Sequence, residues 1–374
     1  MREGIPTTRH RTKTGANRNS QSVTVLHVTD RLGGGVATSI ESYLRNSPAN
    51  MQHHLLAIEP DGAAISGMEM QGLKSFHRLP RSMALRPLAI RRVTKLTKAD
   101  VVHAHSSFAG ALVRTSLKQS RSLRLVYTPH CFAFERTDTR LAGLFALVEK
   151  VLRRNTTTLA ACSRRERDLA ISRLGFKEDQ VAYIPNVATD RADIANPRDS
   201  GSLSENAAPL KILAVGRLAA QKDPQFFLKA VTQITALVGE VDAEWLGSGD
   251  AQLRNLLVSA NIRVSAWKPH ADVLRQLASS HVYFHTAAWE GFPMAVLEAA
   301  MVGVPQLVRQ IPAFEHVPPS LTIDTGLTEL ARAWRYGEYD HWKQTNVSAW
   351  RSLLSENRAS EQSKALRAVW AMES

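Results

Sequence analysis

The chain contains little cysteine and no long apolar run. Its 374 residues include two cysteines, Cys131 and Cys162, too few for the disulfide framework of a small secreted domain. No stretch of 18 apolar residues and no apolar N-terminal segment is present, so the sequence predicts neither a membrane span nor a secretory signal. We therefore expect a cytoplasmic protein.

Acidic residues are also in the minority. There are 34 Asp and Glu against 47 Lys and Arg, which gives a formal net charge of +13 and a pI near 10.0. This balance favours anionic partners, and nucleotide-sugars, phospholipid surfaces and nucleic acid all fit that description. The sequence carries no recognised nucleic-acid-binding motif, so nucleic acid is not expected as a partner.

With 44% hydrophobic residues, a chain of this length has enough apolar material for two domains. Short runs of Val, Ile and Leu alternate with helical patterns, which is typical of α/β domains with doubly wound parallel sheets. We expect one such domain over residues 22–195 and a second over 210–326. Strands are predicted in the first near Val23, Leu55, Val101, Leu125, Thr158 and Val181, and in the second near Lys211, Ala243, Ile262, Val282 and Gln306.

Three further segments complete the predicted organisation. Residues 1–21 are rich in Arg, Thr, Ser and Asn, and we expect a disordered basic tail there. Residues 196–209 are rich in Ser, Gly, Asn and Pro, a composition that indicates a linker between the domains. Residues 327–374 have a Trp-rich helical pattern.

Residues 78–98 form the most basic stretch of the chain. They contain seven Lys or Arg and no acid, with apolar residues between them. Part of the stretch is predicted to form a basic amphipathic helix, which suits docking on an anionic membrane surface. An ordinary surface helix whose apolar side chains face its own core fits the pattern equally well. Both interpretations stay open.

The segment 289–299 places two carboxylates at a predicted loop-to-helix junction. Glu290 lies on the loop, and Glu298 lies within the helix, of which Pro293 is expected to be the first residue. Gly291 lets the backbone come close to a ligand, and the free amides at a helix start favour an anion. This layout suits a phosphate with sugars on either side. The plainer interpretation of Glu298 is a helix-start carboxylate stabilised by the helix dipole.

A basic pair follows another apolar run. Arg217 and Lys222 come after Leu210–Val215, at the predicted carboxyl edge of the second sheet, where open α/β folds bind ligands. An Arg holds a diphosphate through two parallel hydrogen bonds, while a Lys adds a point charge. Two solvated surface charges are the alternative.

Two histidines, His103 and His105, alternate along a predicted strand, which places both on one face. A pair on one face is the beginning of a metal site. No acidic or cysteine partner accompanies them at metal-like spacing, so no metal is predicted.

Taken in chain order, these motifs resemble those of glycosyltransferase family 4. Members of that family are retaining enzymes of the GT-B fold, in which two Rossmann-like doubly wound parallel-sheet domains face each other across a cleft. The resemblance extends from about residue 22 to residue 316. It is carried by Glu290-Gly291-Phe292-Pro293 with Leu297-Glu298-Ala299, by Gly216–Lys222, by Val101–Ser107, by Val126–Phe132 and by Gly33-Gly34-Gly35 after Val23–Thr29.

The resemblance implies roles on the donor side. Arg217 and Lys222 would grip the diphosphate and neutralise the departing nucleotide, and Glu298 would accept hydrogen bonds from the ribose. Glu290 would hold hydroxyls of the donor sugar, and His130, after Thr128-Pro129, would lie beside that sugar. The nucleotide contacts would also include Gly291, Phe292 and Pro293.

On the acceptor side the resemblance implies a glycine loop and a histidine. Gly33, Gly34 and Gly35, expected to precede a helix over Val36–Leu44, would admit the acceptor next to the donor sugar, and His105 would contact the substrate as well. The glycines do not form the dinucleotide signature, and a tight turn without a ligand is the alternative. For His130 the alternative is a core histidine. The resemblance further suggests that the last helix of the Trp350–Trp370 region crosses back to the first domain.

Two positions depart from the family pattern. Val187 follows Ile184-Pro185-Asn186 where relatives have glycine, so the hinge conformation is expected to differ there, because a β-branched residue does not readily adopt positive φ. Glu315 matches an acid after the last strand of the second domain, but the glycines expected beside it are missing.

The implied reaction moves a sugar from a UDP- or GDP-linked donor to a hydroxyl of a sugar or lipid-linked acceptor, with retention and without a metal or cofactor. Surface polysaccharide or glycolipid biosynthesis is the expected setting, with the enzyme cytoplasmic and peripheral on the inner face of the membrane. Two alternatives stay open. One is a nucleotide-sugar epimerase or hydrolase of the same fold, and the other is a non-catalytic basic protein that binds membrane or nucleic acid.

Overall fold

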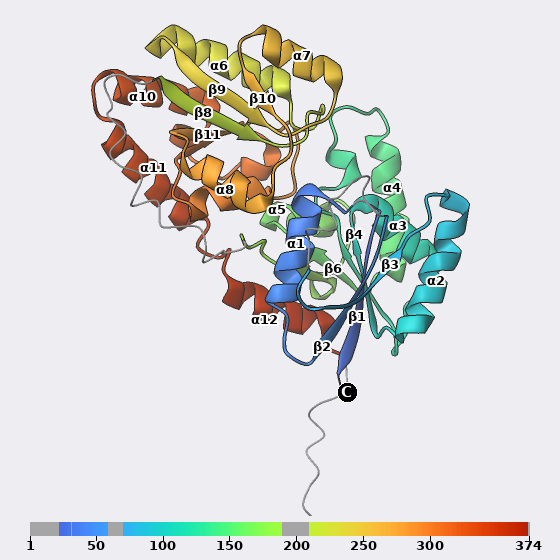
Figure 1. The fold of residues 1–374 in the computed structure, drawn as a ribbon. Helices are drawn as coiled ribbons and strands as arrows, with labels where there is room; N and C mark the ends of the chain where they lie inside the picture. Colours follow the sequence, from blue (N-terminus) through green and yellow to red (C-terminus); the bar gives the residue numbers. More distant parts are fainter. Residues whose placement is uncertain (1–21, 31, 59–69, 189–208, 373–374) are drawn as a thin grey trace, which may run out of the picture.

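The computed structural model describes residues 22–30, 32–58, 70–188 and 209–372, and it contains two α/β domains (Figure 1). The predicted tail at 1–21 and nearly all of the predicted linker at 196–209 lie outside the described residues. The first sheet has the strand order β3-β2-β1-β4-β5-β6-β7 and the second β10-β9-β8-β11-β12, with every strand pair parallel. The two doubly wound parallel sheets confirm the predicted fold class.

Seven strands make up the first sheet: β1 (Val23–Thr29), β2 (Met51–Ala57), β3 (Leu73–Arg78), β4 (Val101–His105), β5 (Arg124–Thr128), β6 (Thr158–Ala161) and β7 (Val181–Tyr183). The sequence analysis missed β3. This strand lies at the edge of the sheet and has no fully buried residue, and its two apolar side chains, Leu73 and Phe76, lie three positions apart and do not alternate with the polar ones. Periodicity therefore gave no signal of a strand there.

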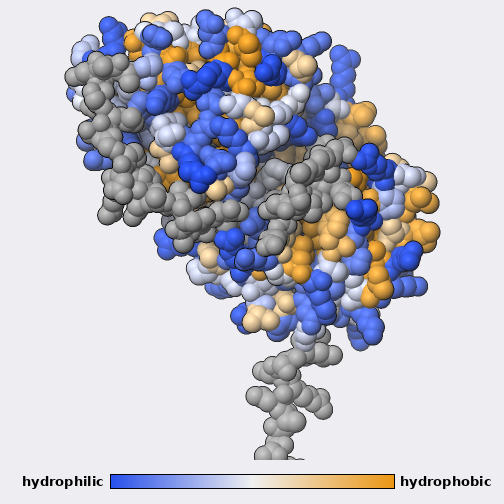
Figure 2. All heavy atoms as spheres, in the orientation of Figure 1, coloured by the Kyte–Doolittle hydropathy of each residue, from blue (hydrophilic) through white to orange (hydrophobic). Residues whose placement is uncertain are grey.

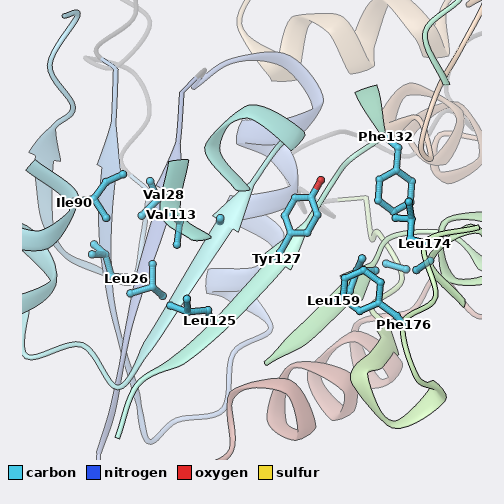
Figure 3. Close-up of a cluster of buried hydrophobic side chains, with 14 of the residues drawn as sticks. Leu26, Val28, Ile90, Val113, Leu125, Tyr127, Phe132, Leu159, Leu174 and Phe176 are labelled. Atoms are coloured by element: carbon cyan, nitrogen blue, oxygen red, sulfur yellow. The ribbon is translucent and has the colours of Figure 1, made fainter. Parts of the chain in front are cut away.

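The helices of this domain are α1 (Gly34–Arg45), α2 (Arg86–Thr97), α3 (Ser107–Ser116), α4 (Ala142–Leu152) and α5 (Arg164–Ser172), joined by single 3₁₀ turns at residues 83–85, 133–135, 153–155 and 178–180. Alternate strand residues such as Leu26 and Val28 point into a core shared with Phe132 and Phe176 (Figure 3). This core is built beneath the loop that follows β5, and it therefore supports the loop that carries His130.

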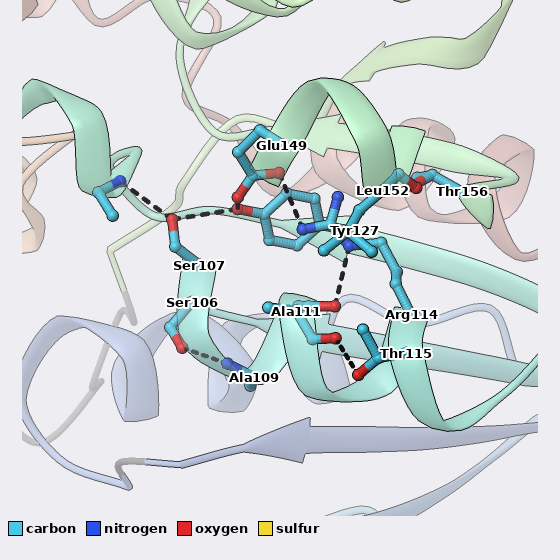
Figure 4. Close-up of polar contacts among 12 residues, drawn as sticks. Ser106, Ser107, Ala109, Ala111, Arg114, Thr115, Tyr127, Glu149, Leu152 and Thr156 are labelled. Carbon is cyan, nitrogen blue, oxygen red and sulfur yellow. Dashed lines mark hydrogen bonds and ion pairs between the residues drawn. The ribbon is translucent and has the colours of Figure 1, made fainter. Parts of the chain in front are cut away.

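A buried polar network joins α3 and α4 to β5 (Figure 4). The guanidinium of Arg114 lies 2.8 Å from Glu149 Oε2 and 3.9 Å from the centre of the Tyr127 ring, and the Tyr127 hydroxyl donates to Glu149 Oε1 at 2.9 Å. Gly110 makes room for this ring, because a Cβ there would lie 2.4 Å from Tyr127 Cε2. Arg114 and Glu149 thus each have a partner of opposite charge and further hydrogen bonds, as buried charges require.

The second sheet contains β8 (Leu210–Val215), β9 (Val241–Leu246), β10 (Arg263–Ser265), β11 (Val282–His285) and β12 (Gln306–Val308). Its helices are α6 (Pro224–Val238), α7 (Ala251–Ser259), α8 (His270–Ala278), α9 (Met294–Met301), α10 (Ile323–Arg335) and α11 (Tyr339–Leu353), with 3₁₀ turns at residues 312–314 and 319–321. The predicted boundary after residue 326 is wrong. It would cut α10, whose Leu327 and Leu330 pack in the same core as Trp245 and Phe227.

The last helix, α12 (Ala359–Trp370), packs on the first domain, where Figure 1 shows it beside β1 and β2. Leu366, Val369 and Trp370 belong to a core cluster with Val25 of β1. Trp350, by contrast, is buried in the second domain. The chain therefore returns to the first domain after α11.

The basic stretch 78–98 divides between the two interpretations given for it. Its helix, α2, begins at Arg86, and Ile90 and Val93 face the core as an ordinary surface helix requires. Leu88 and Leu96, however, are each 66% exposed. Among the described residues, no helix combines the length and apolar content needed to cross a bilayer.

Candidate functional site

The site is assembled where loops at the carboxyl edges of the two sheets meet. From the second domain, the loop between β11 and α9 carries Glu290, and the loop after β8 carries Lys222. Lys222 Nζ forms an ion pair with Glu290 Oε1, and these side chains are 22% and 10% exposed. The structure thus brings together two residues that lie 68 positions apart, and each neutralises the other.

A neutral histidine lies behind this ion pair. His285 Nε2 is buried 3.9 Å from Glu290 Oε1, and the Tyr283 hydroxyl lies 2.9 Å from His285 Nδ1. Burial holds the pKa of His285 well below its ordinary value of 6.5, and the Lys222 charge lowers it further. The neutral His285 ring therefore adds no charge beside the Lys222–Glu290 ion pair.

Helix α9 begins one residue later than the sequence predicted. Pro293 has extended backbone angles, φ −76° and ψ 128°, so it precedes the helix, and the first helical amide is that of Met294. Because Pro lacks an N–H, moving the start of the helix from Pro293 to Met294 removes no hydrogen-bond donor. Glu298, fifth in the helix, is not a helix-start carboxylate, and its Oε1 instead lies 2.9 Å from His270 Nε2. Leu297 is core, and Phe292 is half-buried.

The loop with Arg217 is held against the loop after β9. A Cβ on Gly247 would lie 2.1 Å from the Gly216 carbonyl oxygen, which also accepts a 2.8 Å hydrogen bond from Trp245 Nε1. Glycine is therefore required at residue 247 for the two loops to meet. Arg217 itself is exposed at the end of β8.

The first domain contributes a turn with unusual backbone angles. His130 has φ 51° and Cys131 has φ 93°, although neither is glycine. Such conformations are costly for ordinary residues and persist where the surrounding structure enforces them. Cys131 N donates to Glu166 Oε1 at 2.5 Å, which fixes the turn from below. Burial raises the pKa of the Cys131 thiol, as expected for a packing cysteine.

This turn touches the second domain directly at Gly291. A Cβ there would lie 2.6 Å from Cys131 N, 2.7 Å from Glu166 Oε1 and 2.8 Å from the His130 carbonyl carbon. The structure therefore places the His130 turn and the Glu290 loop, from different domains, in van der Waals contact. Only a residue without a side chain allows this approach.

Sequence reasoning missed Glu166. Its carboxylate accepts from Cys131 N and, at 2.9 Å, from Cys162 N, and burial raises the pKa of Glu166 to about 7. A local signal was present, because Ser163 and Glu166 have the spacing of a capping box, and Ser163 Oγ accepts from Glu166 N at 3.1 Å. That motif predicts a helix start but not the long-range bond to Cys131.

His105, predicted to contact the substrate, lies beneath the surface of the site. Its side chain is fully buried behind His130, and its Nδ1 lies 3.1 Å from His130 Nε2. His103 and His105 do share one face, with ring centres 4.2 Å apart. A third histidine, His27 of β1, joins them, and one ring nitrogen from each of the three lies within 4.8 Å of the others. His27 was not predicted as a partner, because it lies on another strand, far from His103 in the sequence.

The glycine run opens α1 instead of preceding it. Gly34 is the first residue of the helix, two positions before the predicted start at Val36, and Gly33 to Gly35 are exposed. A Cβ on Gly35 would lie 3.6 Å from Met294 Cγ at the start of α9. The run therefore faces the same junction between the domains as Glu290.

The hinge needs no glycine at residue 187. Val187 is not among the positive-φ residues of the described chain. Asn186 makes the specific contacts, since its Nδ2 donates to the Phe292 carbonyl at 3.0 Å and its Oδ1 accepts from Ser39 at 3.2 Å. Glu315 forms a 3.3 Å ion pair with Arg165 across the junction.

Two parallel-sheet domains whose carboxyl-edge loops meet at one junction define the GT-B class of fold. The chain belongs to the group 1 glycosyltransferases, because the models of a glycosyl transferase 4-like domain and of the glycosyl transferases group 1 match residues 18–187 and 196–318. The predicted family is thereby confirmed.

Individual relatives are distant. The chain is 29% identical over 239 residues to the UDP-Gal:alpha-D-GlcNAc-diphosphoundecaprenol alpha-1,3-galactosyltransferase of Escherichia coli, covering 60% of this chain and 61% of that one. An uncharacterised 41.2 kDa protein in the cps region of Klebsiella pneumoniae is 24% identical over 82% of this chain and 85% of its own. The structure of Anabaena HepE with UDP and glucose aligns with a TM-score of 0.69 at 16% identity, over 92% of this chain and 98% of that one.

Proposed function

We propose that the chain transfers a sugar from a UDP-sugar to a hydroxyl of a lipid-linked acceptor, with retention of anomeric configuration and without a metal ion, in the synthesis of a surface polysaccharide. One observation carries this proposal. The Lys222–Glu290 ion pair lies at the junction where Gly291 touches the His130 turn. A cation for the diphosphate and a carboxylate for the sugar are therefore adjacent, and both border the first domain.

Donor binding would separate the ion pair. The diphosphate takes Lys222, and Arg217 at the end of β8 adds a second cation that is able to bind two phosphate oxygens at once. Glu290 is then released to accept hydrogen bonds from sugar hydroxyls. Glu298, held by His270 at 2.9 Å, has one further carboxylate oxygen for the ribose. These two cations offset the charge of the leaving nucleotide without a metal.

The chemical step requires no protein nucleophile. As the bond between the sugar carbon and the diphosphate oxygen breaks, the acceptor oxygen forms its bond to the same carbon on the same face. The acceptor proton passes to the departing diphosphate oxygen. The His130 carbonyl, in a turn fixed by Glu166, is preorganised to face the positive charge that develops on the sugar.

The choice of donor and acceptor class rests on the relatives. The E. coli relative is named for a UDP-galactose donor and a diphosphoundecaprenol-linked acceptor, and HepE was crystallised with UDP and glucose. Both names specify UDP, which favours UDP over GDP for this chain. The cps relative supports a polysaccharide setting.

Calorimetry tests the donor assignment. Micromolar binding of UDP and one UDP-sugar is expected, together with a loss of at least about tenfold in affinity in the Arg217→Ala, Lys222→Ala double variant, since removing two phosphate contacts costs more than about 1.4 kcal/mol. Lys229→Ala is the matched control, because that Lys is exposed on α6 away from the junction. Binding that survives the double variant unchanged would contradict the assignment.

Product analysis separates the reaction from its alternatives. With a lipid-linked acceptor present, ¹H NMR of the product should show an anomeric coupling that matches the donor, and EDTA should not reduce the rate. Release of free sugar, or of an epimerised nucleotide-sugar, without any acceptor would favour a hydrolase or an epimerase. Binding of membrane or DNA without UDP binding would favour a non-catalytic protein.

A surface of the first domain suits a lipid-linked acceptor. Helices α2, α3 and α4 lie side by side, and Figure 2 shows apolar side chains at the edge of the domain where Figure 1 places them. On α4 the exposed positions recur every three or four residues, as on one helix face. The exposed apolar residues of this surface are Met83, Leu85, Leu88, Leu96, Phe108, Leu141, Leu144, Leu147, Val148 and Val151.

Basic residues border the same surface. Arg91, Arg92 and Lys95 of α2 are exposed, as is Lys150 of α4. Apolar side chains framed by cations suit the interface of an anionic bilayer, where apolar groups enter the boundary and cations bind headgroups. We propose that the α2–α4 surface docks on such a bilayer. From the sequence only the α2 part of this surface was proposed.

Vesicle sedimentation tests this docking. The protein is expected to sediment with vesicles that contain phosphatidylglycerol more than with pure phosphatidylcholine, and the Leu144→Glu, Leu147→Glu double variant should lose most of this binding. Leu237→Glu is the control, because Leu237 is exposed on α6 of the second domain. Equal binding by the double variant and the control would contradict the docking surface.

A further inference from the structure

Four histidines and a serine form an unbroken hydrogen-bonded chain through the first domain. Ser47 Oγ lies 2.7 Å from His53 Nε2, and His53 Nδ1 lies 3.1 Å from His27 Nε2. His27 Nδ1 lies 3.0 Å from His105 Nε2, and His105 Nδ1 lies 3.1 Å from His130 Nε2. The chain runs from the loop before β2 to the turn after β5, and so it crosses the sheet from its amino edge to its carboxyl edge.

Strand register explains why these rings meet. His27 of β1 is paired with Leu55 of β2 on one side and with His103 of β4 on the other. His53 lies two residues before Leu55, and His105 lies two residues after His103. Because side chains alternate along a strand, all of these residues point to the same face of the sheet. The histidines therefore form a diagonal across β2, β1 and β4.

The rings in this chain are neutral. Burial holds the pKa of His27 and His105 well below 6.5, with neighbouring histidines adding to the effect, and it lowers the pKa of His53 and His130 to about 4. A neutral imidazole has one N–H and one lone pair. Each contact between two ring nitrogens therefore contains a single proton. The direction of the hydrogen bond at one end of the chain consequently determines the tautomer of every histidine in it.

Ser47 sets that orientation. Its hydroxyl donates to the Pro48 carbonyl at 3.3 Å, which leaves its oxygen as an acceptor for the N–H of His53 Nε2. His27 then donates from Nε2, His105 donates from Nε2, and His130 donates from Nε2 to His105. The remaining nitrogen of His130, Nδ1, keeps its lone pair and has no hydrogen bond to any residue that the structure describes. His130 is partly exposed at the junction, so Nδ1 is the nitrogen left for a ligand.

We propose that Ser47, His53, His27 and His105 form a relay that fixes His130 as the Nε2–H tautomer, so that His130 Nδ1 accepts a hydrogen bond from a substrate hydroxyl. The relay residues are positioning residues, because they act only through His130. A lone pair at Nδ1 selects an O–H donor such as a sugar hydroxyl, and it disfavours a phosphate oxygen at the same place. The identity of that hydroxyl rests on the proposed function, whereas the tautomer does not.

A metal ion at His27, His103 and His105 would require a different arrangement. Both nitrogens of His103 are already occupied, since Trp370 Nε1, which can only donate, lies 3.3 Å from Nδ1, and Thr128 Oγ1 lies 2.8 Å from Nε2. An ion would have to displace one of these bonds and also break the contact between His27 and His105. Existing hydrogen bonds therefore occupy both ring nitrogens of His27, His103 and His105.

Heteronuclear NMR of the ligand-free protein, labelled with ¹⁵N-histidine, tests the tautomer. Protonated and unprotonated ring nitrogens differ widely in ¹⁵N shift, and His130 is assigned by comparison with His130→Gln. The expected result at pH 7.5 is a protonated Nε2 and an unprotonated Nδ1. An Nδ1–H form of His130 would overturn the relay, and so would about one equivalent of zinc that survives dialysis and is lost in His27→Gln. Neither outcome bears on whether the protein transfers sugar.

The variant Ser47→Ala tests the relay through its outer end. It removes the acceptor for His53 without touching substrate, so the His130 spectrum should show both tautomers, and kcat should fall about two- to tenfold, the range expected for one hydrogen bond. The Kd for UDP should stay unchanged, because Lys222 and Arg217 are unaffected. Ser75→Ala is the matched control, since Ser75 Oγ bonds the neighbouring His54 at 2.6 Å outside the relay. A single Nε2–H tautomer and an unchanged kcat in Ser47→Ala would overturn the role of Ser47.

Discussion

Single residues decide how closely the two domains approach. Gly291 lies against the backbone of His130 and Cys131 and against the Glu166 carboxylate, with no room for a Cβ. Backbone atoms in a turn already at positive φ have little freedom to move away. A substitution at Gly291 therefore tests whether the junction between the domains is closed during catalysis.

The variant Gly291→Ala should slow catalysis more than it weakens donor binding. We expect kcat to fall by at least about tenfold, because the added methyl group separates Glu290 from the His130 turn. This corresponds to an increase of about 1.4 kcal/mol in activation free energy. Calorimetry with UDP should show nearly the wild-type Kd, since Lys222 and Arg217 both belong to the second domain.

Gly143→Ala is the control for that substitution. Gly143 lies in α4 with nothing within 4 Å of its Cβ position, so the change should leave kcat unaltered and stabilise the helix slightly. A Gly291→Ala enzyme with normal kcat would show that the junction opens during turnover.

At this scale the sequence predicted the second-domain residues better than those of the first. Lys222 and Glu290 are brought together as expected for a common ligand, because both follow strands of one sheet whose carboxyl ends share an edge. Glu166, His27 and His53 were missed, because their partners lie on other strands and helices. No local pattern contains the strand register that aligns His27 with His103.

Secondary-structure elements were predicted well where apolar runs are long, and poorly where they are short. Among the described residues, eleven of the twelve strands follow from Val, Ile and Leu runs, whereas edge strand β3 has no such run. The starts of α1 and α9 were each displaced, by two residues and one residue, because glycine and proline tolerate positions on both sides of a helix boundary. These shifts leave the site residues on the same loops.

Helix α12 should stabilise the first domain, on which it packs, and not the second domain, which precedes it in the sequence. Trp370→Ala is expected to cost about 3–5 kcal/mol of unfolding free energy, because this fully buried ring packs in the core with Val25 and Tyr43. Hydrogen exchange should locate the loss in β1 and β4, while β8 and β9 keep their protection.

Trp267→Ala provides the comparison, because that side chain is 51% exposed and its removal should change stability by less than about 0.5 kcal/mol. If Trp370→Ala weakened protection in β8 and β9 as strongly as in β1 and β4, the two domains would unfold as one unit.

At the scale of the whole molecule, the buried histidines make stability depend on pH. In the unfolded chain they bind protons near pH 6.5, whereas in the folded chain His53 and His130 bind them only near pH 4, and the pKa of His27, His103 and His105 is also well below 6.5. The unfolded state therefore holds more protons below pH 6.5. The stabilisation is complete above pH 6.5 and is lost as the pH falls toward about 4.

Urea unfolding between pH 7.5 and 5 measures this dependence. Below pH 6.5 each such histidine contributes a slope of up to about 1.4 kcal/mol per pH unit, so the total slope there should be several times larger. Glu166, with its pKa raised to about 7, contributes one proton of opposite sign between pH 4.5 and 7.

His53→Gln should lower the slope by about 1.4 kcal/mol per pH unit. His316→Gln should leave the slope unchanged, because the side chain of His316 is 84% exposed. A flat profile for the unsubstituted protein would mean that water reaches the histidine chain.

The return of α12 also sets the order in which the molecule is completed. During synthesis, β1 to β7 leave the ribosome before the second domain, yet the face of their sheet that carries the histidine chain is covered only in part, by Tyr43 of α1, until Trp370 has been made. The core of the second domain lies between residues 210 and 353, so its completion does not depend on α12. The half of the protein that is translated first is therefore the half whose core is completed last, and a translation product that stops before α12 carries its defect in the amino-terminal half.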